Sequence, residues 1–377
     1  MNIQEDKISE LLSCHHASSG ITGTIALFKD DDLGFSISCA DAGRPFHTIL
    51  GAHTAYGLAS AAKLFTAIAA LLLIQQRKLA LDTSVRDIFG DAFPYLSAEM
   101  TIHQLIIHTS GISEYFNDCE PQGFESVWKS TPTYRVREPK DFISLIQTCS
   151  TSPRQQGLFK YRNSGYVALG LIVEAVSGQS FYRFVEGNIF ESADMTDSGY
   201  FHVDMLPNHA TVGYLKDGSG RWKSNLFSIP ARGGGEGGAY CSPRDMHRLW
   251  RAILGGKLLD APTRQKFLSP QVQDGSDGEW FYSFGYWINQ VGNEVIKYTC
   301  VGEDPGCSVR YFYYPRNDSA LSVFTNVSDG AGKLSVDLQN MLWGSFNQKA
   351  CEPETLNTCT TALSSCSTQR VCVENVE

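Results

Sequence analysis

Residues 59–76 read ASAAKLFTAIAALLLIQQ, and this stretch decides the fold. Its apolar side chains recur on nearly every face of a helix, which is typical of a helix buried in a protein core. Residues 64–74 carry no charge, but this run is too short to span a bilayer. We therefore predict a central buried helix over residues 59–76, around which other segments pack.

Ser60 and Lys63 stand at the start of this predicted helix, three residues apart. Residues at this spacing share a helix face, so the amine would lie one turn below the hydroxyl. A serine becomes nucleophilic when a base takes its proton, and burial and the positive end of the helix dipole favour the neutral amine that this requires. Ser-x-x-Lys also occurs at Ser126 to Lys129, so the alternative is a lysine reaching from a core helix to solvent.

Tyr161 and Asn163 form a second candidate pair. A tyrosine near a neutral lysine can relay a proton between nucleophile and leaving group, and an asparagine amide can fix the lysine or a substrate carbonyl. The same Tyr-x-Asn pattern occurs at Tyr115. The alternative for Tyr161 is a half-buried structural tyrosine before a helix.

Strand-like segments lie towards both ends of the sequence, and helical segments lie between them. Predicted strands span residues 21–29, 35–40, 284–290, 294–300, 309–314 and 321–325. Predicted helices flanking the middle of the chain span residues 3–14, 242–254 and 334–346, and Ser242 with Pro243 forms the start of the second of these. We infer that distant strands share one antiparallel sheet, with a helical insertion between them.

The composition narrows the class of protein. The 377 residues carry a formal net charge of −9. Proteins that bind nucleic acid usually present a basic face to it, so this charge argues against a nucleic-acid partner. Residues 1–7 contain acidic residues and no apolar core, so we expect no secretory signal and a cytoplasmic protein without a membrane span. There is no His-Glu-x-x-His motif, and the glycines of residues 233–238 lack the βαβ setting of a dinucleotide site. We therefore predict no metal and no cofactor.

Several further motifs follow one another in order along the chain. They are HTSGI at 108–112, YRNSGY at 161–166, GGAYCS at 237–242 and GEDPG at 302–306. Together with Ser60 and Lys63, this set resembles the class C β-lactamase-like serine hydrolases over roughly residues 21–347. That family includes β-lactamases, D,D-peptidases, D-aminopeptidases, esterases and some acyltransferases.

The resemblance implies an α+β fold, in which an antiparallel sheet flanked by helices lies beside a mainly helical domain. The active site would occupy the cleft between them. We expect the α/β sandwich domain to comprise residues 1–80 and 228–350, and the helical domain residues 81–227. Residues 351–377 are rich in Ser, Thr and Cys, so we expect a flexible tail.

The resemblance also assigns roles to matching residues. It implies that Ser60 is the nucleophile, Lys63 its paired base, and Tyr161 with Asn163 the second motif. One oxyanion-hole N–H would come from the nucleophile itself, and the other from the strand that carries the third motif. Two such donors stabilise a tetrahedral intermediate by several kcal/mol. His108, in the Thr-Ser-Gly segment, is an alternative candidate for a base, but we expect it to be a structural histidine that caps a loop.

The third motif departs from the family pattern. Relatives carry Lys-Thr-Gly or His-x-Gly, and the matching residues here are Cys300, Val301 and Gly302. That cation normally helps to hold a substrate carboxylate or to polarise the tyrosine, so its loss argues against β-lactam and peptide-carboxylate recognition. We expect Asn163, Cys300, Gly302 and Glu303 to line the substrate site, with the Glu303 N–H as the second oxyanion donor.

The sequence therefore predicts a serine hydrolase that forms a covalent acyl-enzyme on a small or short-peptide ester or amide. An acyltransferase with an alcohol or amine acceptor would share the same intermediate. A binding or sensor protein that is acylated slowly or not at all remains a third hypothesis, because the third-motif cation is missing. Cys300 as a thiol nucleophile is disfavoured, since nothing in its neighbourhood would activate it.

Overall fold

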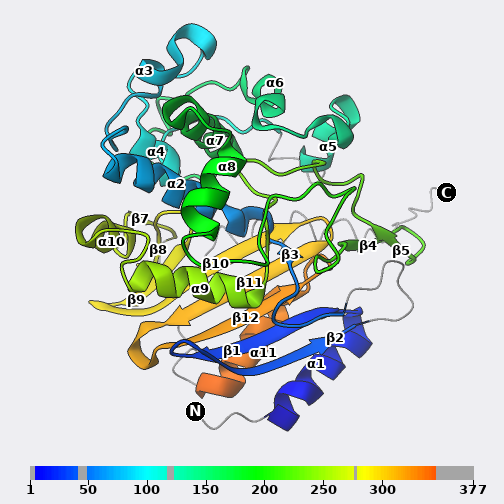
Figure 1. The fold of residues 1–377 in the computed structure, drawn as a ribbon. Coiled ribbons are helices and arrows are strands. Elements are labelled where there is room, and N and C mark those ends of the chain that lie inside the picture. The colour runs from blue at the N-terminus through cyan, green and yellow to red at the C-terminus, as the bar shows by residue number, and fades with distance from the viewer. Residues whose placement is uncertain (1–4, 41–48, 117–122, 276–277, 345–377) are drawn as a thin grey trace, which may run out of the picture.

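The computed structural model describes residues 5–40, 49–116, 123–275 and 278–344 (Figure 1). Its largest element is an eight-stranded antiparallel sheet with the order β2-β1-β12-β11-β10-β9-β8-β7. The strands are β1 (Gly23–Lys29), β2 (Asp32–Cys39), β7 (Val272–Gln273), β8 (Trp280–Tyr282), β9 (Trp287–Val291), β10 (Glu294–Asp304), β11 (Cys307–Tyr314) and β12 (Ser319–Thr325). The inference that distant strands share one sheet is therefore confirmed.

Strand β1 lies beside strand β12, although almost 300 residues separate them in the sequence. Gly23 pairs with Thr325 and Lys29 pairs with Ser319, so the two strands match along their whole length. The hairpin of β1 and β2 thereby becomes one edge of the sheet, and β7 becomes the other.

Helices cover both faces of the sheet (Figure 1). Helices α1 (Glu5–Ser19) and α11 (Ala331–Trp343) pack on one face, and α9 (Pro243–Leu254) packs on the other. Strand β11 is buried throughout because its side chains alternate between these layers. Phe312 faces α1 and α11, and Tyr311 faces α9.

Most of the other helices gather beyond the α9 face, at the top of Figure 1, around α2 (Lys63–Gln75) and α7 (Asn163–Ser177), whereas α10 lies beside α9 and β7. These two helices pack against each other and are largely buried. The other α-helices are α3 (Val85–Phe89), α4 (Ile102–Ile106), α5 (Gly123–Ser130), α6 (Ile143–Ile146), α8 (Phe181–Val185) and α10 (Ala261–Phe267). Short turns of helix are η1 (Ala59–Ala62), η2 (Gly90–Ala92), η3 (Thr133–Arg135), η4 (Pro139–Phe142), η5 (Glu186–Phe190) and η6 (Pro315–Asn317). Two small sheets pair β3 (Tyr56–Gly57) with β6 (Tyr240–Cys241) and β4 (Tyr214–Lys216) with β5 (Trp222–Ser224).

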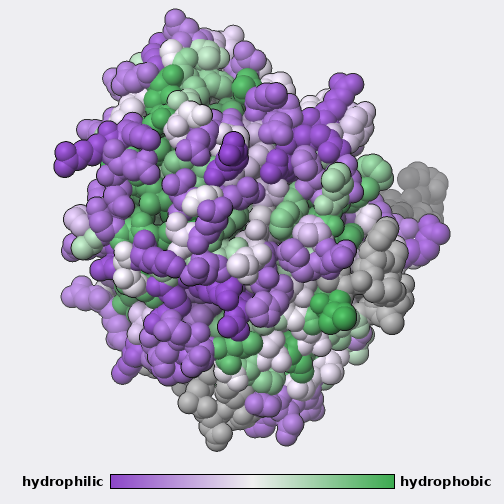
Figure 2. All heavy atoms as spheres, viewed as in Figure 1, coloured by the Kyte–Doolittle hydropathy of each residue, from purple (hydrophilic) through white to green (hydrophobic). Residues whose placement is uncertain are grey.

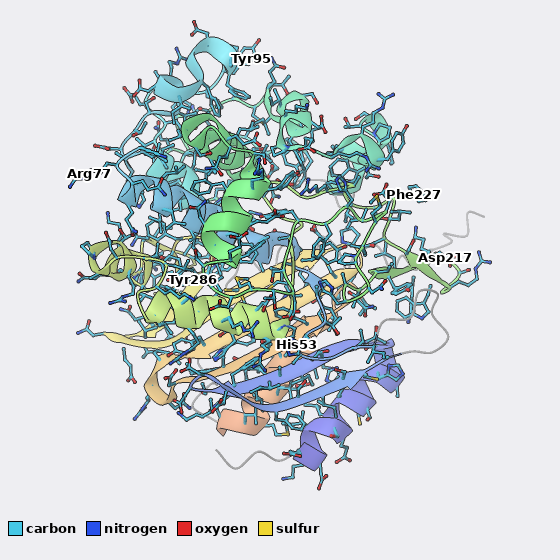
Figure 3. The ribbon with its side chains drawn as sticks, in the orientation of Figure 1. His53, Arg77, Tyr95, Asp217, Phe227 and Tyr286 are labelled. Carbon is cyan, nitrogen blue, oxygen red and sulfur yellow. The ribbon has the colours of Figure 1, made fainter. Side chains whose placement is uncertain are left out.

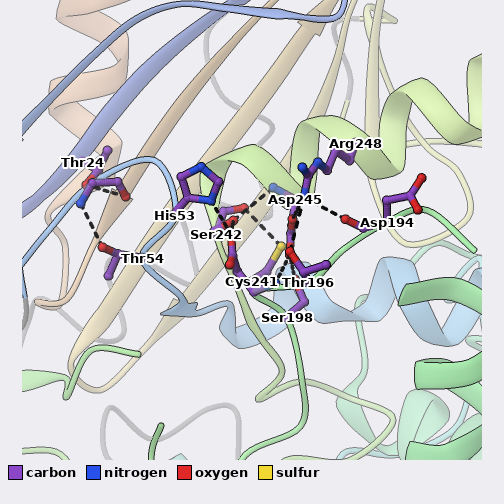
Figure 4. Close-up of polar contacts among 12 residues, drawn as sticks. Thr24, His53, Thr54, Asp194, Thr196, Ser198, Cys241, Ser242, Asp245 and Arg248 are labelled. Carbon is purple, nitrogen blue, oxygen red and sulfur yellow. Dashed lines mark hydrogen bonds and ion pairs between the residues drawn. The ribbon is translucent and has the colours of Figure 1, made fainter. Parts of the chain in front are cut away.

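The N-terminus of α9 holds the loop that follows η5 (Figure 4). The Ser242 hydroxyl accepts the Asp245 N–H at 3.1 Å, which confirms the predicted helix start. The buried Asp245 carboxylate accepts the Asp197 N–H at 2.7 Å and the Ser198 hydroxyl at 2.9 Å, and Arg248 donates to it at 3.1 Å. The sheet layer and the helical part are thus tied together by hydrogen bonds as well as by apolar contact.

The surface is mixed in character. The face in Figure 2 is mainly hydrophilic, with hydrophobic residues interspersed. Phe227, 75% exposed, and Asp217 at the β4–β5 hairpin lie towards the same side of the molecule, whereas Tyr286 is enclosed between α9, α10 and the sheet (Figure 3). Among the described helices, none has the length and apolar character needed to cross a membrane.

The sequence predicted most elements but not all of their limits. The predicted strands and flanking helices are present with shifted ends, whereas the short strands β3 to β8 were missed. The prediction of one continuous helix over residues 59–76 was wrong at its start, where η1 precedes α2. Residues 345–377, which include the end of the last predicted helix and the predicted tail, lie outside the described residues. The proposed domain limits remain a prediction.

Strand β10 approaches η1 more closely than any side chain would permit. A Cβ atom on Gly302 would lie 1.9 Å from the Leu58 carbonyl oxygen and 3.0 Å from the Ala61 nitrogen. The main chain of residues 58–61 therefore rests directly on that of β10. Glycine at this point sets the spacing between the strand and the turn that carries Ser60.

We expect Gly302→Ala to lower the free energy of unfolding by about 2–3 kcal/mol, because the new methyl group must push the two backbones apart. Urea unfolding followed by circular dichroism would measure this. Gly218→Ala is the matched control: a Cβ there meets no atom within 4 Å, so its effect should stay below about 0.5 kcal/mol. Equal effects of the two substitutions would contradict the close contact.

Candidate active site

Ser60 lies on η1, and Lys63 is the first residue of α2. A 3₁₀-helix has three residues per turn, so side chains three positions apart lie directly above one another. The Lys63 Nζ is accordingly 3.0 Å from the Ser60 Oγ. Ala59 has a φ of 48°, a region that costs a residue with a Cβ roughly 1–2 kcal/mol, so the backbone just before Ser60 is strained.

Within the described part of the chain, the buried amine of Lys63 lies within hydrogen-bonding distance of polar groups from Ser60, Asn163 and Glu236. Its Nζ lies 2.7 Å from the Asn163 Oδ1 and 2.6 Å from the main-chain oxygen of Glu236, besides the contact with Ser60. The amide and main-chain oxygens can only accept, so each takes one N–H of the amine. An uncharged amine would then direct its lone pair towards the third neighbour, the Ser60 hydroxyl. This arrangement suits a base that removes the serine proton.

Tyr161 lies beside this amine. The Lys63 Nζ is 4.9 Å from the centroid of the Tyr161 ring. That ring stacks on Trp287, with centroids 5.8 Å apart and planes inclined by 14°, and the imidazole of His108 lies beside it at 4.3 Å. The structure thus brings together Ser60, Lys63, Tyr161 and Asn163, which the sequence had predicted as one site.

His108 holds the backbone of the second motif in place through a hydrogen bond. Its buried Nδ1 accepts the Arg162 N–H at 3.0 Å, and its φ of 58° is unusual for a residue with a side chain. Burial, and next the charge of Lys63, hold the pKa of His108 well below its ordinary value. The imidazole is therefore neutral and fixes the backbone beside Tyr161, in agreement with the structural role expected for it.

Glu114 fixes the start of α7 and was missed from the sequence. Its carboxylate accepts the Asn163 N–H at 2.6 Å, the Ser164 N–H at 3.1 Å and the Ser164 hydroxyl at 2.8 Å. These are unpaired donors of a helix N-terminus, for which an acceptor usually comes from the preceding residue. Here the cap comes from 49 residues upstream, so a local capping pattern could not reveal it. Burial raises the pKa of Glu114.

The loop of residues 233–238 crosses α7 next to Lys63. A Cβ on Gly235 would lie 2.2 Å from the Tyr166 carbonyl oxygen and 2.9 Å from the Gly170 Cα. Glycine is therefore required for close packing on the helix. This crossing brings the Glu236 carbonyl to Lys63, which explains the glycine-rich motif without a nucleotide.

The side chains of Cys300 and Glu303, both predicted to line the substrate site, point to opposite faces of β10. Cys300 is 1% exposed, and burial raises the pKa of its thiol to about 12. This placement in the core does not provide the substrate contact predicted for Cys300, and it also argues against a thiol nucleophile. The Glu303 carboxylate lies on the opposite face from Gly302, where the Arg310 Nη1 at 2.7 Å and the Ser308 hydroxyl at 2.6 Å donate to it.

The main chain of β10 nevertheless remains available at the site. Strand β9 pairs with β10 only as far as Thr299, so in the described part of the chain residues 300–304 have no strand partner on that edge. Within this stretch, Gly302 lies directly against the main chain of residues 58–61. An open strand edge beside Ser60 can present an N–H to a substrate oxygen, as expected for Glu303.

Acidic groups surround Lys63, and the sequence did not assign them a role. Asp304 follows Gly302 on the same face of β10, and burial raises its pKa to about 7, although the charge of Lys63 acts to lower it. Burial likewise raises the pKa of Glu236 to about 8. Tyr115, which had seemed a second copy of the Tyr-x-Asn motif, has its pKa raised by burial and then by Glu236, Glu114 and Asp304. These residues therefore border one acidic site.

Comparisons with known proteins identify the family and the fold. The sequence model of the β-lactamase family matches residues 21–342. Penicillin-binding protein 4* of Bacillus subtilis is 28% identical over 329 residues, and the match covers 81% of this chain and 68% of the length of that protein. The penicillin-binding protein of Bacillus halodurans is 36% identical in its crystal structure, with a TM-score of 0.80 and coverage of 89% of this chain and all of that one.

A D-stereospecific amidohydrolase from Streptomyces has the same fold at 19% identity, with a TM-score of 0.75, covering 91% of this chain and all of that one. The family match spans most of the chain, and the sheet, the helical part and the ordered motifs all fall within it. This chain therefore belongs to the β-lactamase family of serine hydrolases.

Proposed function

We propose that this protein is a serine hydrolase that cleaves an ester or amide through a covalent acyl-enzyme on Ser60. One observation carries the proposal: the Lys63 amine is enclosed, has two acceptors for its hydrogens, and lies 3.0 Å from the Ser60 Oγ. A serine beside such an amine is activated without a histidine or a metal.

The reaction would proceed in two steps. Lys63 takes the Ser60 proton while the Oγ forms a bond to the substrate carbonyl carbon, and the carbonyl oxygen becomes the oxyanion. The tetrahedral intermediate collapses, the bond to the leaving group breaks, and the leaving group receives the proton by way of the Tyr161 hydroxyl. Water then repeats the sequence on the acyl-enzyme and releases the acid.

Two main-chain groups are suited to hold the oxyanion. They are the N–H of Ser60 and the N–H of Glu303 on the open edge of β10. Such donors are worth several kcal/mol because they are already oriented when the charge develops. The contact of Gly302 with residues 58–61 sets the distance between them.

Ester and amide substrates are favoured over β-lactams. The named relatives include penicillin-binding proteins and an amidohydrolase, which all belong to this fold. In this chain the third-motif cation is replaced by Cys300, which is buried and neutral. We therefore expect a chromogenic cephalosporin to be turned over far more slowly than a 4-nitrophenyl short-chain ester. Product analysis with added alcohol or amine separates hydrolysis from acyl transfer.

A fluorophosphonate probe should label wild-type protein, and Ser60→Ala should abolish both labelling and ester hydrolysis. Intact-protein mass spectrometry with peptide mapping would locate the adduct. Ser126→Ala is the matched control, since it removes the serine of the second Ser-x-x-Lys sequence and should leave labelling unchanged. Labelling that persists in Ser60→Ala would refute the proposal.

Asn163→Asp tests whether Lys63 acts as an uncharged amine. A carboxylate in place of the amide would stabilise the ammonium form, so labelling at pH 7 should slow by at least about tenfold. The pH of half-maximal labelling should rise by about 1–3 units, and activity should recover in alkaline solution. Labelling rates across pH 6–10 would measure this. An unchanged profile would indicate that another group takes the proton.

The free energy of unfolding should fall as pH rises from about 4.5 to about 8. In the unfolded chain Glu236 ionises near its ordinary pKa of 4.5, whereas burial raises its folded pKa to about 8. The unfolded state therefore loses its proton first, and raising the pH favours unfolding. Urea unfolding at pH 5, 6.5 and 8 should show a weaker decline for Glu236→Gln than for wild type. The exposed Glu99→Gln should decline as wild type does; identical slopes for all three proteins would contradict the raised pKa.

A further inference from the structure

Trp287 is the first residue of β9, and its indole stacks on the ring of Tyr161. The two ring centroids are 5.8 Å apart, and the planes are inclined by 14°. Tyr282, which pairs with Trp287 between β8 and β9, meets the Tyr161 ring edge-on at 6.1 Å. Tyr161 is only half-buried, so these contacts restrict a side chain that would otherwise be free to turn towards solvent. The position of the phenol therefore depends on the start of β9.

A buried carboxyl group fixes the plane of this indole. The Trp287 Nε1–H donates to the Asp274 Oδ2 at 2.8 Å, and Asp274 is buried. Asp274 directly follows β7, and its own N–H donates to the Trp280 carbonyl oxygen of β8 at 2.8 Å. Rotation of the indole away from Tyr161 would leave a buried N–H unpaired, which is unfavourable. Strands β7 and β8 thus hold Trp287 in the orientation that it presents to the tyrosine.

The turn that leads into β9 also touches the base. Gly285 lies two residues before Trp287 and has a φ of 89°. A Cβ atom on Gly285 would lie 2.7 Å from the nitrogen and the Cα of Leu64 and 2.8 Å from the carbonyl carbon of Lys63. Residues 285–287 therefore contact the start of α2 at one end and the Tyr161 ring at the other. This short segment fixes the base and the phenol relative to each other, with the Lys63 Nζ 4.9 Å from the ring centroid.

The third motif is joined to the tyrosine by apolar contact. Cys300, at the position of the family's cation, is buried and neutral, so it offers no positive charge that could orient Tyr161. Val301, the next residue of β10, belongs to the same buried cluster as Trp287 and Tyr282, and Tyr161 packs against that cluster. In this chain, shape and a hydrogen-bonded indole are therefore available to hold the phenol where the relatives have a charge.

Resting on the proposed function, we propose that Trp287, held by Asp274, is a positioning residue that directs the Tyr161 hydroxyl towards the leaving group during acylation. In that step the bond from the carbonyl carbon to the leaving atom breaks, and its electron pair stays on the leaving atom. The Tyr161 O–H gives its proton to that atom, and the phenol oxygen receives the proton that Lys63 took from Ser60. Such a transfer contributes about 10²–10⁴-fold to the rate, and the donor must be aligned to within about 0.5 Å.

Two esters with the same acyl group separate positioning from a general loss of structure. The 4-nitrophenolate of 4-nitrophenyl butyrate leaves as a stable anion, whereas the ethoxide of ethyl butyrate is strongly basic and must be protonated as it leaves. The leaving-group ratio, which is kcat/KM for ethyl butyrate divided by kcat/KM for 4-nitrophenyl butyrate, therefore measures proton transfer during acylation. Absorbance follows the nitrophenol, and titration at constant pH follows the acid. A substitution that only loosens the fold lowers both values and leaves this ratio unchanged.

Trp287→Leu should lower the leaving-group ratio by at least about tenfold, because a displacement of about 1 Å at a reacting group costs on the order of 10²-fold. Trp287→Phe keeps a flat ring against Tyr161 and should recover most of the ratio. Trp280→Leu is the matched control. Trp280 is buried in the same cluster and stacks on no face of Tyr161 within the described residues, so its loss should leave the ratio unchanged. Thermal unfolding by circular dichroism checks that each variant is folded.

A double substitution tests whether Trp287 acts through Tyr161. Tyr161→Phe removes the proton donor and should itself lower the leaving-group ratio by at least about tenfold. Adding Trp287→Leu should then change the ratio no further, because the group that it positions is gone. If Trp287→Leu does not fold, Asp274→Ala provides the same comparison, since it removes the hydrogen bond of the indole and leaves every ring in place. It should lower the ratio in the wild-type background and have no effect in Tyr161→Phe.

The outcomes separate the two proposals. The positioning role would be overturned by a leaving-group ratio that the substitutions at Trp287 or Asp274 leave unchanged, or by additive effects in the double variant. It would also be overturned if Tyr161→Phe leaves the ratio unchanged, or if wild type hydrolyses 4-nitrophenyl butyrate but not ethyl butyrate. Labelling of Ser60 would then still support the acyl-enzyme. If Ser60 is not labelled and neither ester is hydrolysed, both proposals fail.

Discussion

The amine of Lys63 is the point on which the site depends. Burying an amine is unfavourable unless its hydrogens are paired, so neighbouring elements must supply acceptors. Helix α7 supplies the Asn163 amide oxygen and the glycine loop supplies the Glu236 carbonyl, and η1 places the Ser60 hydroxyl at the third position around the amine. Gly235 is required because the glycine loop approaches the backbone of α7 more closely than a side chain would allow. Gly302 is required because β10 approaches the backbone of residues 58–61 in the same way. The close packing of these backbones therefore also places the polar groups that surround the Lys63 amine beside the nucleophile.

Much of this arrangement could be read from the sequence because it is encoded locally. The apolar run after Lys63 predicted a buried helix, and alternating strands with turns predicted the sheet. The tight turn at Ser60 could not be distinguished from the helix that follows, because the same three-residue spacing fits both. Ser60, Lys63, Tyr161 and Asn163 were found because the order of the motifs resembled that of a known family.

The sequence analysis missed residues whose roles depend on contacts with segments far away in the sequence. Glu114 caps a helix that begins 49 residues later, and a local pattern holds no trace of such a contact. Asp304 stands in a quoted motif, but its orientation depends on the register of β10, which becomes known only with the fold. Cys300 was placed correctly in the strand, but its side chain faces the core rather than the substrate. Sequence pattern thus identified the strand, and three-dimensional structure was needed to orient its side chains.

The pairing of β1 with β12 has a consequence for how the molecule is made. The ribosome releases β1 almost 300 residues before its partner, and contacts between such distant segments form slowly because a long loop must close. During synthesis, the edge of β1 that pairs with β12 therefore has no partner until β12 has been made. The intervening helices are synthesised and can pack locally in this time. Strand β10, which supports the turn of Ser60, gains its place in the completed sheet only when β11 and β12 have followed it. A ribosome-bound nascent chain that ends before Ser319 would consequently lack the finished sheet, and enzymatic competence would arise as one of the last events of biosynthesis.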